Sequence, residues 1–305
     1  MISLIQLGTV DYATGLRLQE QLVALRKEEK IGDVLLLLEH SPVITLGRNA
    51  KAANVIASPE VLAQRGVELF ECDRGGDVTF HGPGQIVGYP IFDLRGFARG
   101  ATDALVRPGK HLIQGKHLGA VDFVRRLEEV LIRTCADFAI PTKRVPGLTG
   151  VWTVPQNALS PELSFRAKEN DSQNRSLESR NLLLAGTTAN AAAEAKLAAI
   201  GVHISRFVTS HGFALNVNTD LSFFNLIIPC GITAKPVTSM QQELGKPIDL
   251  NAVAESISRN FGTVFSSQML WVETVDALLG RTVGVPMKPP AELGRLHGDD
   301  DIRLA

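Results

Sequence analysis

The sequence predicts an α/β protein in which helices flank a mixed central sheet. Helical and extended hydrophobic patterns alternate along most of the 305 residues, and this alternation is typical of the α/β class. Residues 34–38 are continuously apolar, as expected for a strand that is covered on both faces. We expect one domain over residues 1–286. Residues 287–305 have no core pattern, and we expect them to form a loosely ordered tail.

The individual elements follow from the period of the apolar residues. Leu18, Leu22 and Leu25 recur at helical spacing among charged residues, which predicts a helix. Short apolar runs that end at Gly or Pro predict strands. The expected helices are residues 12–30, 59–65, 121–138 and 251–265. The expected strands are residues 1–7, 34–38, 67–70 and 84–94, followed by a strand-rich stretch at 199–217 that Gly201 and Gly212 interrupt.

Two stretches lack the pattern of a packed core. Residues 97–118 contain Arg, Lys, Gly and His with little apolar periodicity, and residues 155–195 are rich in Ser, Asn, Glu, Arg and Ala. We interpret both as insertions into the domain. Residues 166–180 are too polar to be buried, so we expect a surface loop there.

Charge and cysteine content exclude several classes of protein. The net charge is −1, which provides no overall basic field for nucleic acid. Cys72, Cys135 and Cys230 have no zinc-site spacing, and we expect reduced thiols and a cytoplasmic location. No apolar run approaches the ~20 residues that span a bilayer, and the N-terminus does not resemble a signal peptide. We expect no membrane association and no metal.

A cysteine and a lysine point to covalent chemistry. Cys230 lies in an apolar run between Pro229 and Gly231, and Lys196 lies in an Ala-rich run. The thiolate is the nucleophilic form of cysteine, and a nearby ammonium lowers the thiol pKa. Together the two residues suggest acyl transfer. Taken singly, each has a simpler interpretation, because most free cysteines are buried packing residues and most lysines are solvated.

A glycine-rich segment at residues 74–89 supports a ligand site. It carries five glycines and one proline within what would otherwise be a strand pair. Glycine permits close approach of the main chain to a ligand. By composition alone, a glycine-rich hairpin without a ligand is the simpler interpretation. The segment has no nucleotide phosphate-loop pattern.

The same segment carries a resemblance to a known family. Arg-Gly-Gly-x-x-Thr-Phe-His-Gly-Pro-Gly-Gln, which begins at Arg74, resembles the signature of lipoyl(octanoyl) transferases. Further similar blocks occur in the order found in that family, at residues 35–48, 196–221, 229–232 and 243–245. Several blocks in one order make the resemblance specific. The two insertions depart from the family pattern.

The resemblance implies a fold and an activity. The implied fold is that of the biotin/lipoate protein ligase superfamily, with a larger and a smaller sheet. The implied activity transfers an octanoyl or lipoyl group from acyl carrier protein to a lysine of a lipoyl domain, through a thioester on Cys230. Lys196 would lower the pKa of that thiol and transfer protons. No cofactor and no ATP would be needed. The implied partners are octanoyl-acyl carrier protein, the lipoyl domains of 2-oxoacid dehydrogenase complexes and the glycine cleavage H protein.

The resemblance also implies residues that would surround the acyl group. For His81 and His211, a hydrogen bond to a backbone carbonyl is an interpretation of equal weight to an active-site role, and we interpret Cys72 as a core thiol. The implied substrate-binding residues are Arg74, Gly75, Gly76, Asp77, Val78, Thr79, Phe80, His81, Ala199, Ile200, Gly201, Gly212, Phe213 and Ala214.

Two alternatives remain open at this point. The first is an ATP-dependent lipoate or biotin-type protein ligase, which forms an adenylate and needs no cysteine nucleophile. The second is a carrier-protein binding module without catalytic activity. Cys230 argues against the ligase, and Cys230 together with Lys196 argues against the binding module.

Overall fold

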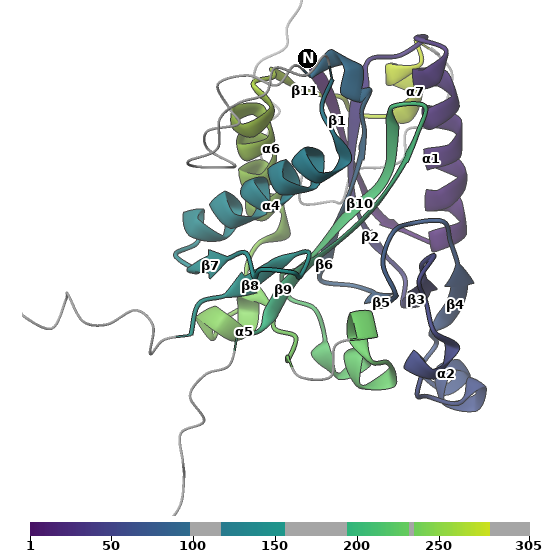
Figure 1. The fold of residues 1–305 in the computed structure, drawn as a ribbon, viewed down its shortest axis with the longest axis vertical. Coiled ribbons are helices and arrows are strands. Elements are labelled where there is room, and N and C mark those ends of the chain that lie inside the picture. Colours follow the sequence, from purple (N-terminus) through teal and green to yellow (C-terminus); the bar gives the residue numbers. More distant parts are fainter. Residues whose placement is uncertain (98–116, 156–193, 232–234, 281–305) are drawn as a thin grey trace, which may run out of the picture.

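The computed structural model describes residues 1–97, 117–155, 194–231 and 235–280. Within these ranges the chain forms two sheets, with helices on both faces of the larger one (Figure 1). Most of the two expected insertions, and the whole expected tail at 287–305, lie outside the described residues. The predicted surface loop at 166–180 also lies outside them.

The large sheet has eight strands and is mixed. Its order is β11-β1-β2-β6-β10-β9-β8-β7. Strand β1 pairs in parallel with β11 and β2, whereas the remaining pairs are antiparallel. The strands are β1 (Ile2–Val10), β2 (Asp33–His40), β6 (Gln85–Ile91), β7 (Thr142–Lys143), β8 (Val151–Thr153), β9 (Lys196–Ser205), β10 (Val208–Asn216) and β11 (Met269–Trp271).

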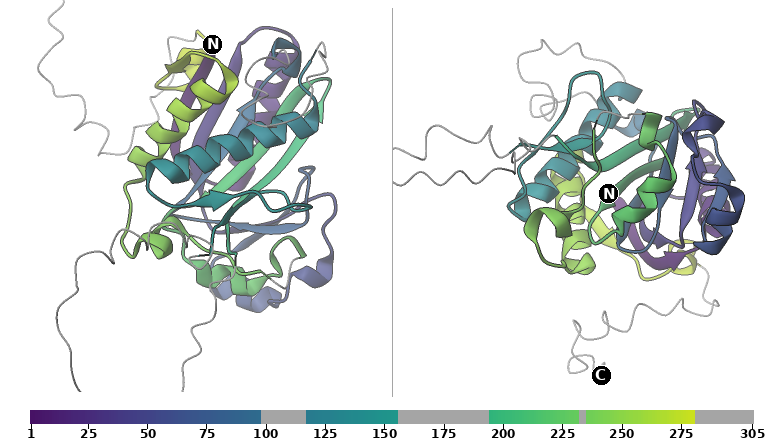
Figure 2. Two further views of the ribbon diagram at one scale, coloured as in Figure 1. Left: turned by 60° about the vertical axis from the view of Figure 1, so that its left-hand side comes forward. Right: turned by 90° about the horizontal axis from the view of Figure 1, so that it is seen from below.

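Helices cover both faces of this sheet. Helix α1 (Tyr12–Lys27) packs Leu22 on one face, against side chains such as Leu36 and Val87. Helices α4 (Ala120–Asp137) and α6 (Leu250–Phe265) pack on the other face, where Phe123 and Phe261 join the main core. Figure 2 shows the two helices side by side, away from α1. The expected mixed sheet between helical layers is therefore confirmed.

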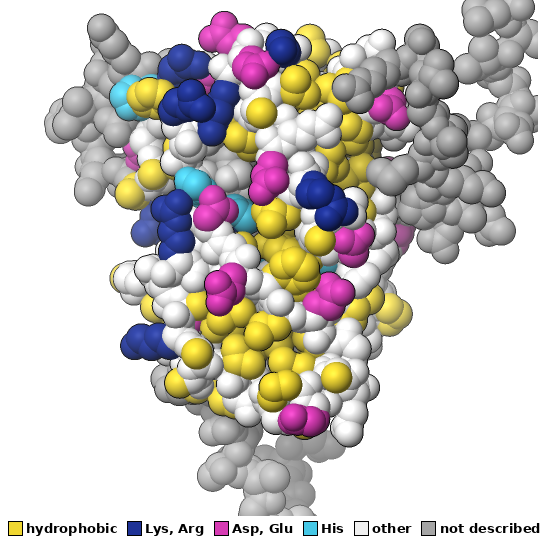
Figure 3. Space-filling view, turned by 90° about the vertical axis from the view of Figure 1, so that its right-hand side faces the viewer, with side chains coloured by type: hydrophobic (Ala, Val, Ile, Leu, Met, Phe, Trp, Pro, Cys, Tyr) yellow, Lys and Arg dark blue, Asp and Glu magenta, His cyan; other side chains and the backbone are white. Residues whose placement is uncertain are grey.

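The small sheet builds a separate core beside the large one. Its order is β4-β3-β5, formed by β4 (Glu68–Glu71), β3 (Val43–Leu46) and β5 (Val78–His81). Leu62 of α2 (Pro59–Gln64) packs on this sheet, together with Phe224 of the short helix η4 (Leu221–Leu226). Ile56, Val61 and Leu69 stay exposed here, and Figure 3 shows hydrophobic side chains gathered on this lower part of the surface.

Short elements complete the described chain. Local caps fix several of them: Ser58 accepts a hydrogen bond from the amide of Val61 at the start of α2, and Ser239 accepts one from Gln242 at the start of α5, as is typical of helix N-termini. None of the helices in the described ranges has the length and hydropathy to cross a membrane. The short elements are η1 (Ala52–Asn54), η2 (Leu94–Gly96), η5 (Pro229–Gly231), α5 (Met240–Leu244) and α7 (Val275–Leu278).

Two expectations about the glycine-containing strands were wrong. Residues 74–89 do not form a strand pair, because β5 pairs with β3 in the small sheet whereas β6 pairs with β2 and β10 in the large one. Gly201 and Gly212 do not interrupt strands either. They face each other across the β9–β10 pair, where the absence of side chains lets other backbone segments approach.

Candidate active site

A pocket of about 480 Å³, counted with its open mouth, lies between the two sheets. We call it the larger pocket. Its floor is formed by β6, β9 and β10, where Val87, Ala214 and Ala199 stand side by side in register. Further along, the paired Gly201 and Gly212 continue the floor without side chains. The side chains of this floor are apolar and small, as expected for a site that holds an aliphatic chain.

The loop at residues 74–77 closes the larger pocket from the side of the small sheet. Arg74 is buried, and its guanidinium donates hydrogen bonds to the carbonyl oxygens of Thr45, Gly75 and Asp77. The Gly75 amide donates to Val202 O at 3.1 Å, which ties the loop to β9. Arg74 therefore shapes the pocket by fixing the loop, with its donors directed to backbone carbonyls and to the Thr45 hydroxyl.

Alternate side chains of strand β5 point to the larger pocket and to the core of the small sheet. Thr79 and His81 line the larger pocket. Val78 and Phe80 alternate with them and belong to the core of the small sheet, since successive side chains of a strand point to opposite faces. Val78 and Phe80, which were also expected at the site, therefore do not line the larger pocket in this structure. The other expected residues all line the larger pocket: Arg74, Gly75, Gly76, Asp77, Thr79, His81, Ala199, Ile200, Gly201, Gly212, Phe213 and Ala214.

A second space of about 280 Å³, the smaller pocket, adjoins the larger one. Both are lined by Thr79, Ala199 and Ala214. Lys196 and Pro229 line the smaller pocket only. Pro229 precedes Cys230 in η5, so the structure brings the Cys230 segment and Lys196 to one space. The Cys230 side chain lies outside the described residues.

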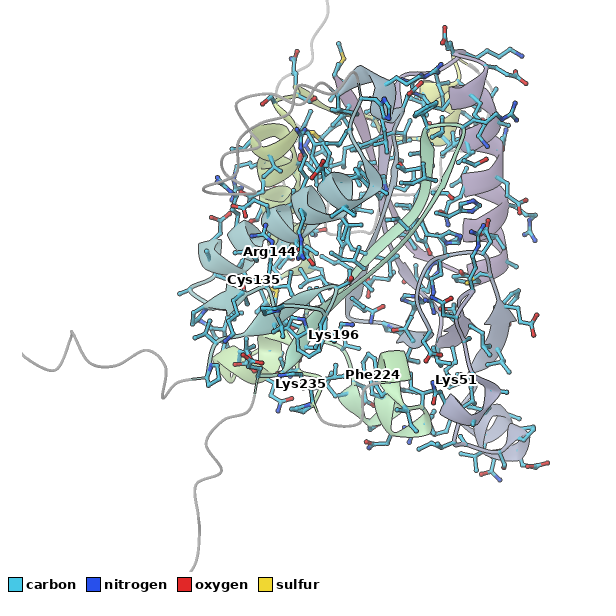
Figure 4. The ribbon with its side chains drawn as sticks, in the orientation of Figure 1. Lys51, Cys135, Arg144, Lys196, Phe224 and Lys235 are labelled. Carbon is cyan, nitrogen blue, oxygen red and sulfur yellow. The ribbon has the colours of Figure 1, made fainter. Side chains whose placement is uncertain are left out.

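Lys196 is a buried strand residue, and not the solvated lysine of a helix or turn. The residue is 8% exposed, and it begins β9. Its amide donates to Pro236 O at 2.8 Å, and its carbonyl accepts from the Thr238 amide at 3.0 Å. The ammonium lies 5.3 Å from the centroid of the Trp152 ring, within the range of a cation–π contact. Figure 4 shows Lys196 between α4 and the segment of Phe224.

Asp77 connects the glycine loop to the cysteine segment. Its Oδ2 accepts a hydrogen bond from Asn54 Nδ2 at 2.5 Å, and the Asn54 carbonyl accepts from the Ile228 amide at 2.7 Å. A Cβ placed on Gly231 would lie 2.8 Å from Asp77 Oδ2. Gly231 has a φ of +65°, so this position favours glycine for both its backbone angle and its contact. Asp77 therefore helps to fix the turn that carries Cys230.

A chain of polar groups runs from the larger to the smaller pocket. His81 Nδ1 lies 2.7 Å from Gln85 Oε1, and Gln85 Nε2 donates to Asn216 Oδ1 at 2.9 Å. Asn216 Nδ2 in turn donates to Thr238 O at 3.0 Å. Because Gln85 Nε2 also donates to Phe80 O, the amide orientation is fixed and His81 donates through Nδ1. Gln85 ends the glycine-rich motif, and Asn216 lies in the similar block at residues 196–221, although the sequence alone assigned it no role.

His211 and Tyr12 also line the larger pocket. His211 Nε2 contacts Asp73 Oδ1 at 2.7 Å. Burial lowers the His211 pKa, although Asp73 opposes the shift. Tyr12 begins α1 and stacks on His81, with ring centroids 6.3 Å apart. Tyr12 was not expected at the site, since it starts a helix remote in sequence from every motif.

The two other cysteines do not line the pockets. Cys135 is fully buried in the main core, and burial raises the pKa of its thiol to about 12. Cys72 is only partly buried, and its thiol donates to Leu46 O. Cys72 is therefore less enclosed than the core thiol we expected. Neither residue lines the larger or the smaller pocket.

Comparison with known families identifies the class of protein. The family described as "Lipoyl protein ligase A/B catalytic domain" matches residues 11–262. The chain therefore belongs to this family, and the expected resemblance is confirmed.

Relatives of known name narrow this class. The octanoyltransferase of Koribacter versatilis is 53% identical over 300 residues, which cover 98% of each chain. The octanoyltransferase of Acidobacterium capsulatum is 48% identical over 281 residues, covering 92% of this chain and 96% of its own. The expected enzyme class, an acyltransferase acting in protein lipoylation, is confirmed by this similarity.

Solved structures support the fold. The bipartite lipoate protein ligase of Thermoplasma acidophilum aligns with a TM-score of 0.55 at 11% identity, covering 92% of this chain and 91% of its own. A lipoate-protein ligase A bound with ATP aligns with the same TM-score, at 11% identity and 92% and 93% coverage. The expected superfamily fold, with a larger and a smaller sheet, is confirmed.

Proposed function

We propose that this protein transfers an octanoyl group from acyl carrier protein to a lysine of a lipoyl domain, through a thioester on Cys230. The observation that carries the proposal is the pair of adjoining pockets. Lys196 and Pro229, the neighbour of Cys230, line the smaller pocket. The larger pocket continues from it along an apolar floor. This arrangement supports a reaction centre that opens into an acyl-chain site.

In the first half-reaction, the Cys230 thiolate attacks the carbonyl carbon of the donor thioester. The bond to the carrier thiol breaks and the enzyme thioester forms. The Lys196 ammonium gives its proton to the departing carrier thiolate and becomes a neutral amine. Before this step the ammonium favours the thiolate form of Cys230, because an opposite charge nearby lowers a thiol pKa.

In the second half-reaction, the acceptor lysine attacks the enzyme thioester as a neutral amine. Lys196, now neutral, takes the proton that this nitrogen loses when the amide forms. The Cys230 thiolate leaves and faces the restored Lys196 ammonium. The cycle is balanced in protons, and exchange of a thioester for an amide proceeds without ATP.

The octanoyl chain would lie in the larger pocket, over Val87, Ala199 and Ala214. Burying an aliphatic chain contributes about 0.8 kcal/mol per methylene, which holds the acyl group while the carrier departs. Both sheets line this pocket, which supports one catalytic domain over residues 1–286. Lipoyl domains of 2-oxoacid dehydrogenases and the glycine cleavage H protein are the proposed acceptors. The unpaired thiols of Cys72 and Cys135 support the proposed cytoplasmic location.

Single cysteine variants test the nucleophile. Cys230→Ala should abolish transfer from octanoyl-acyl carrier protein to a lipoyl domain, because no thioester can form. Cys72→Ala and Cys135→Ala are the matched controls, and both should retain transfer. Near-normal turnover by Cys230→Ala, measured by the mass of the lipoyl domain, would show that the covalent route is wrong.

A further inference from the structure

We propose that Glu128 of α4 is a positioning residue for Lys196, acting through the segment of Gly150 and Trp152. The inference rests on the proposed function, because it assigns a role relative to the Lys196 ammonium. Glu128 lies on the helical layer, outside both pockets. It therefore touches neither the acyl chain nor the reacting atoms in this account.

Gly150 is the point of contact with the lysine. A Cβ on Gly150 would lie 2.9 Å from Lys196 Cε and 2.5 Å from the Ala198 carbonyl oxygen. Its φ of +121° also favours glycine over residues with a side chain. The backbone at Gly150 thus lies directly against the aliphatic stem of Lys196. A shift of this backbone segment would displace the ammonium at the end of that stem.

Glu128 fixes the position of the Gly150 backbone relative to α4. Its side chain is fully buried, and Oε1 accepts the Gly150 amide at 3.2 Å. Oε2 accepts Arg125 Nη1 at 2.6 Å and Arg144 Nε at 3.0 Å. Buried carboxylates are costly unless they are paired and hydrogen-bonded. Here both oxygens are bonded, one to charged groups and the other to the Gly150 amide.

Trp152 connects the Gly150 segment to the Lys196 ammonium. It follows Gly150 by two residues, pairs with Lys196 across β8–β9 and is 1% exposed. Its ring contacts the Lys196 ammonium, and Lys235 Nζ lies 5.6 Å from the same ring. The Lys235 charge is balanced by Glu194, which also pairs with Lys143. Glu128, Gly150 and Trp152 therefore form one support from α4 to Lys196.

The competing explanation is that Glu128 only stabilises an ion network on α4. Glu129 belongs to that network, accepting Arg133 Nε at 2.9 Å and Arg144 Nη2 at 2.8 Å. Glu129 is the matched control. It binds Arg144 as Glu128 does, but the hydrogen bond to the Gly150 amide is made by Glu128. A role in the network depends on the negative charge of Glu128. A positioning role depends on the reach of an oxygen to Gly150.

Two substitutions separate charge from reach. Glu128→Asp keeps the charge, but it is one methylene shorter and cannot reach Gly150 while paired with the arginines. Glu128→Gln loses the charge but keeps an oxygen at the same reach. The readouts are the pH profile of Cys230 alkylation by iodoacetamide, followed on its peptide by mass spectrometry, and the kcat and KM of transfer. Lys196→Ala defines the profile of an enzyme without the ammonium.

We expect Glu128→Asp to move the alkylation profile toward that of Lys196→Ala. It should lower kcat about ten- to a hundred-fold, the scale of a small misplacement of a catalytic group, with KM little changed. Glu128→Gln should shift the profile less, and Glu129→Gln should leave it unchanged. Trp152→Leu, which removes the ring beneath the ammonium, should act in the same direction as Glu128→Asp.

The outcomes separate this inference from the proposed function. If Lys196→Ala leaves the alkylation profile unchanged, the proposed role of Lys196 fails. If Lys196→Ala shifts the profile and Glu128→Asp does not, the positioning role is wrong while the role of Lys196 stands. A larger loss in Glu128→Gln than in Glu128→Asp would assign Glu128 to the ion network alone. If Glu128→Asp does not fold, an unshifted profile in Trp152→Leu overturns the inference.

Discussion

Burial holds two histidines beside the larger pocket in the neutral form. His40 lies between Val10 O at 2.8 Å and the Tyr89 hydroxyl at 2.6 Å, and burial lowers its pKa to about 4. Burial, with His40 nearby, lowers the pKa of His81 to about 3. Neither side chain is an imidazolium at neutral pH, so neither supplies the acid that protonates the departing carrier thiolate in the proposed mechanism.

These lowered pKa values predict acid sensitivity. The unfolded chain binds protons at both positions below pH ~6.5, whereas folded His40 and His81 bind them only near pH 4 and pH 3. Their contribution to stability is therefore complete above pH 6.5 and is lost as the pH falls toward 4 and 3. Each histidine should reduce the unfolding free energy by about 1.4 kcal/mol per pH unit in this window.

Urea unfolding at pH 7 and pH 5 measures this loss. His40→Gln should flatten the pH dependence, because one titrating group is removed. His117→Gln is the control, since His117 is exposed, and it should retain the wild-type dependence. An equal loss of stability in the wild type and in His40→Gln would contradict the assignment.

At the scale of residues, the sequence indicated most of the side chains that line the larger pocket, but not the direction in which each side chain points. The motif around Thr79 was recognisable, and alternation along a strand divides its residues into two sets. Only the placement of the small sheet decides that Thr79 and His81 face the pocket while Phe80 faces the core. The sequence also did not predict the burial of Lys196, because the residues of β8 and α4 that enclose it are distant in sequence.

At the scale of elements, glycine allows the central strands to lie close to one another. A Cβ on Gly212 would lie 2.1 Å from the Gly88 carbonyl oxygen, and one on Gly88 would lie 2.1 Å from Phe213 Cζ. A Cβ on Gly201 would lie 2.5 Å from Gly75 O, which belongs to the loop that closes the pocket. These glycines are needed for close packing within strands, which explains why their interpretation as interruptions was wrong.

Gly212→Ala should therefore destabilise the protein. The added methyl would meet backbone on β6, and overpacking of this kind costs about 1–3 kcal/mol. Gly32→Ala is the matched control, because a Cβ there meets nothing within 4 Å. Thermal unfolding compares the two variants. Equal melting temperatures for Gly212→Ala and Gly32→Ala would contradict the close packing described here.

The sequence predicted whether most elements are helices or strands, because the periodicity of long segments such as α4 and α6 is enough to identify them as helices. It did not predict which strands pair. The turn at residues 82–84 resembles that of a hairpin, yet it leads from the small sheet into the large one. Strands β3, β8 and β11 are short and owe their conformation to pairing with neighbours, which local pattern does not reveal.

At the scale of the whole molecule, the proposed reaction uses both sheets. The large sheet supplies Lys196 and the apolar floor, while the small sheet supplies Thr79 and the loop held by Arg74. The Cys230 segment connects to the small-sheet side through Asn54 and Ile228. An ATP-dependent ligase on the same fold would not need a cysteine at this junction.

The energy source distinguishes the proposed acyl transfer from an ATP-dependent ligase activity. The protein should transfer the octanoyl group from octanoyl-acyl carrier protein without ATP, because the donor thioester is already activated. Free octanoate with ATP and magnesium should give no modified lipoyl domain. Mass measurement of the lipoyl domain under both conditions decides between them. Modification that requires ATP and free octanoate would favour the ligase.

The most direct test of the covalent mechanism is mass spectrometry of the protein after incubation with octanoyl-acyl carrier protein alone. The account predicts an octanoyl group on the peptide that contains Cys230, and its loss when a lipoyl domain is added. Lys196→Ala should accumulate the adduct more slowly, and Cys230→Ala should not form it. Transfer to the lipoyl domain without an adduct on Cys230, or with an adduct on another residue, would contradict the account.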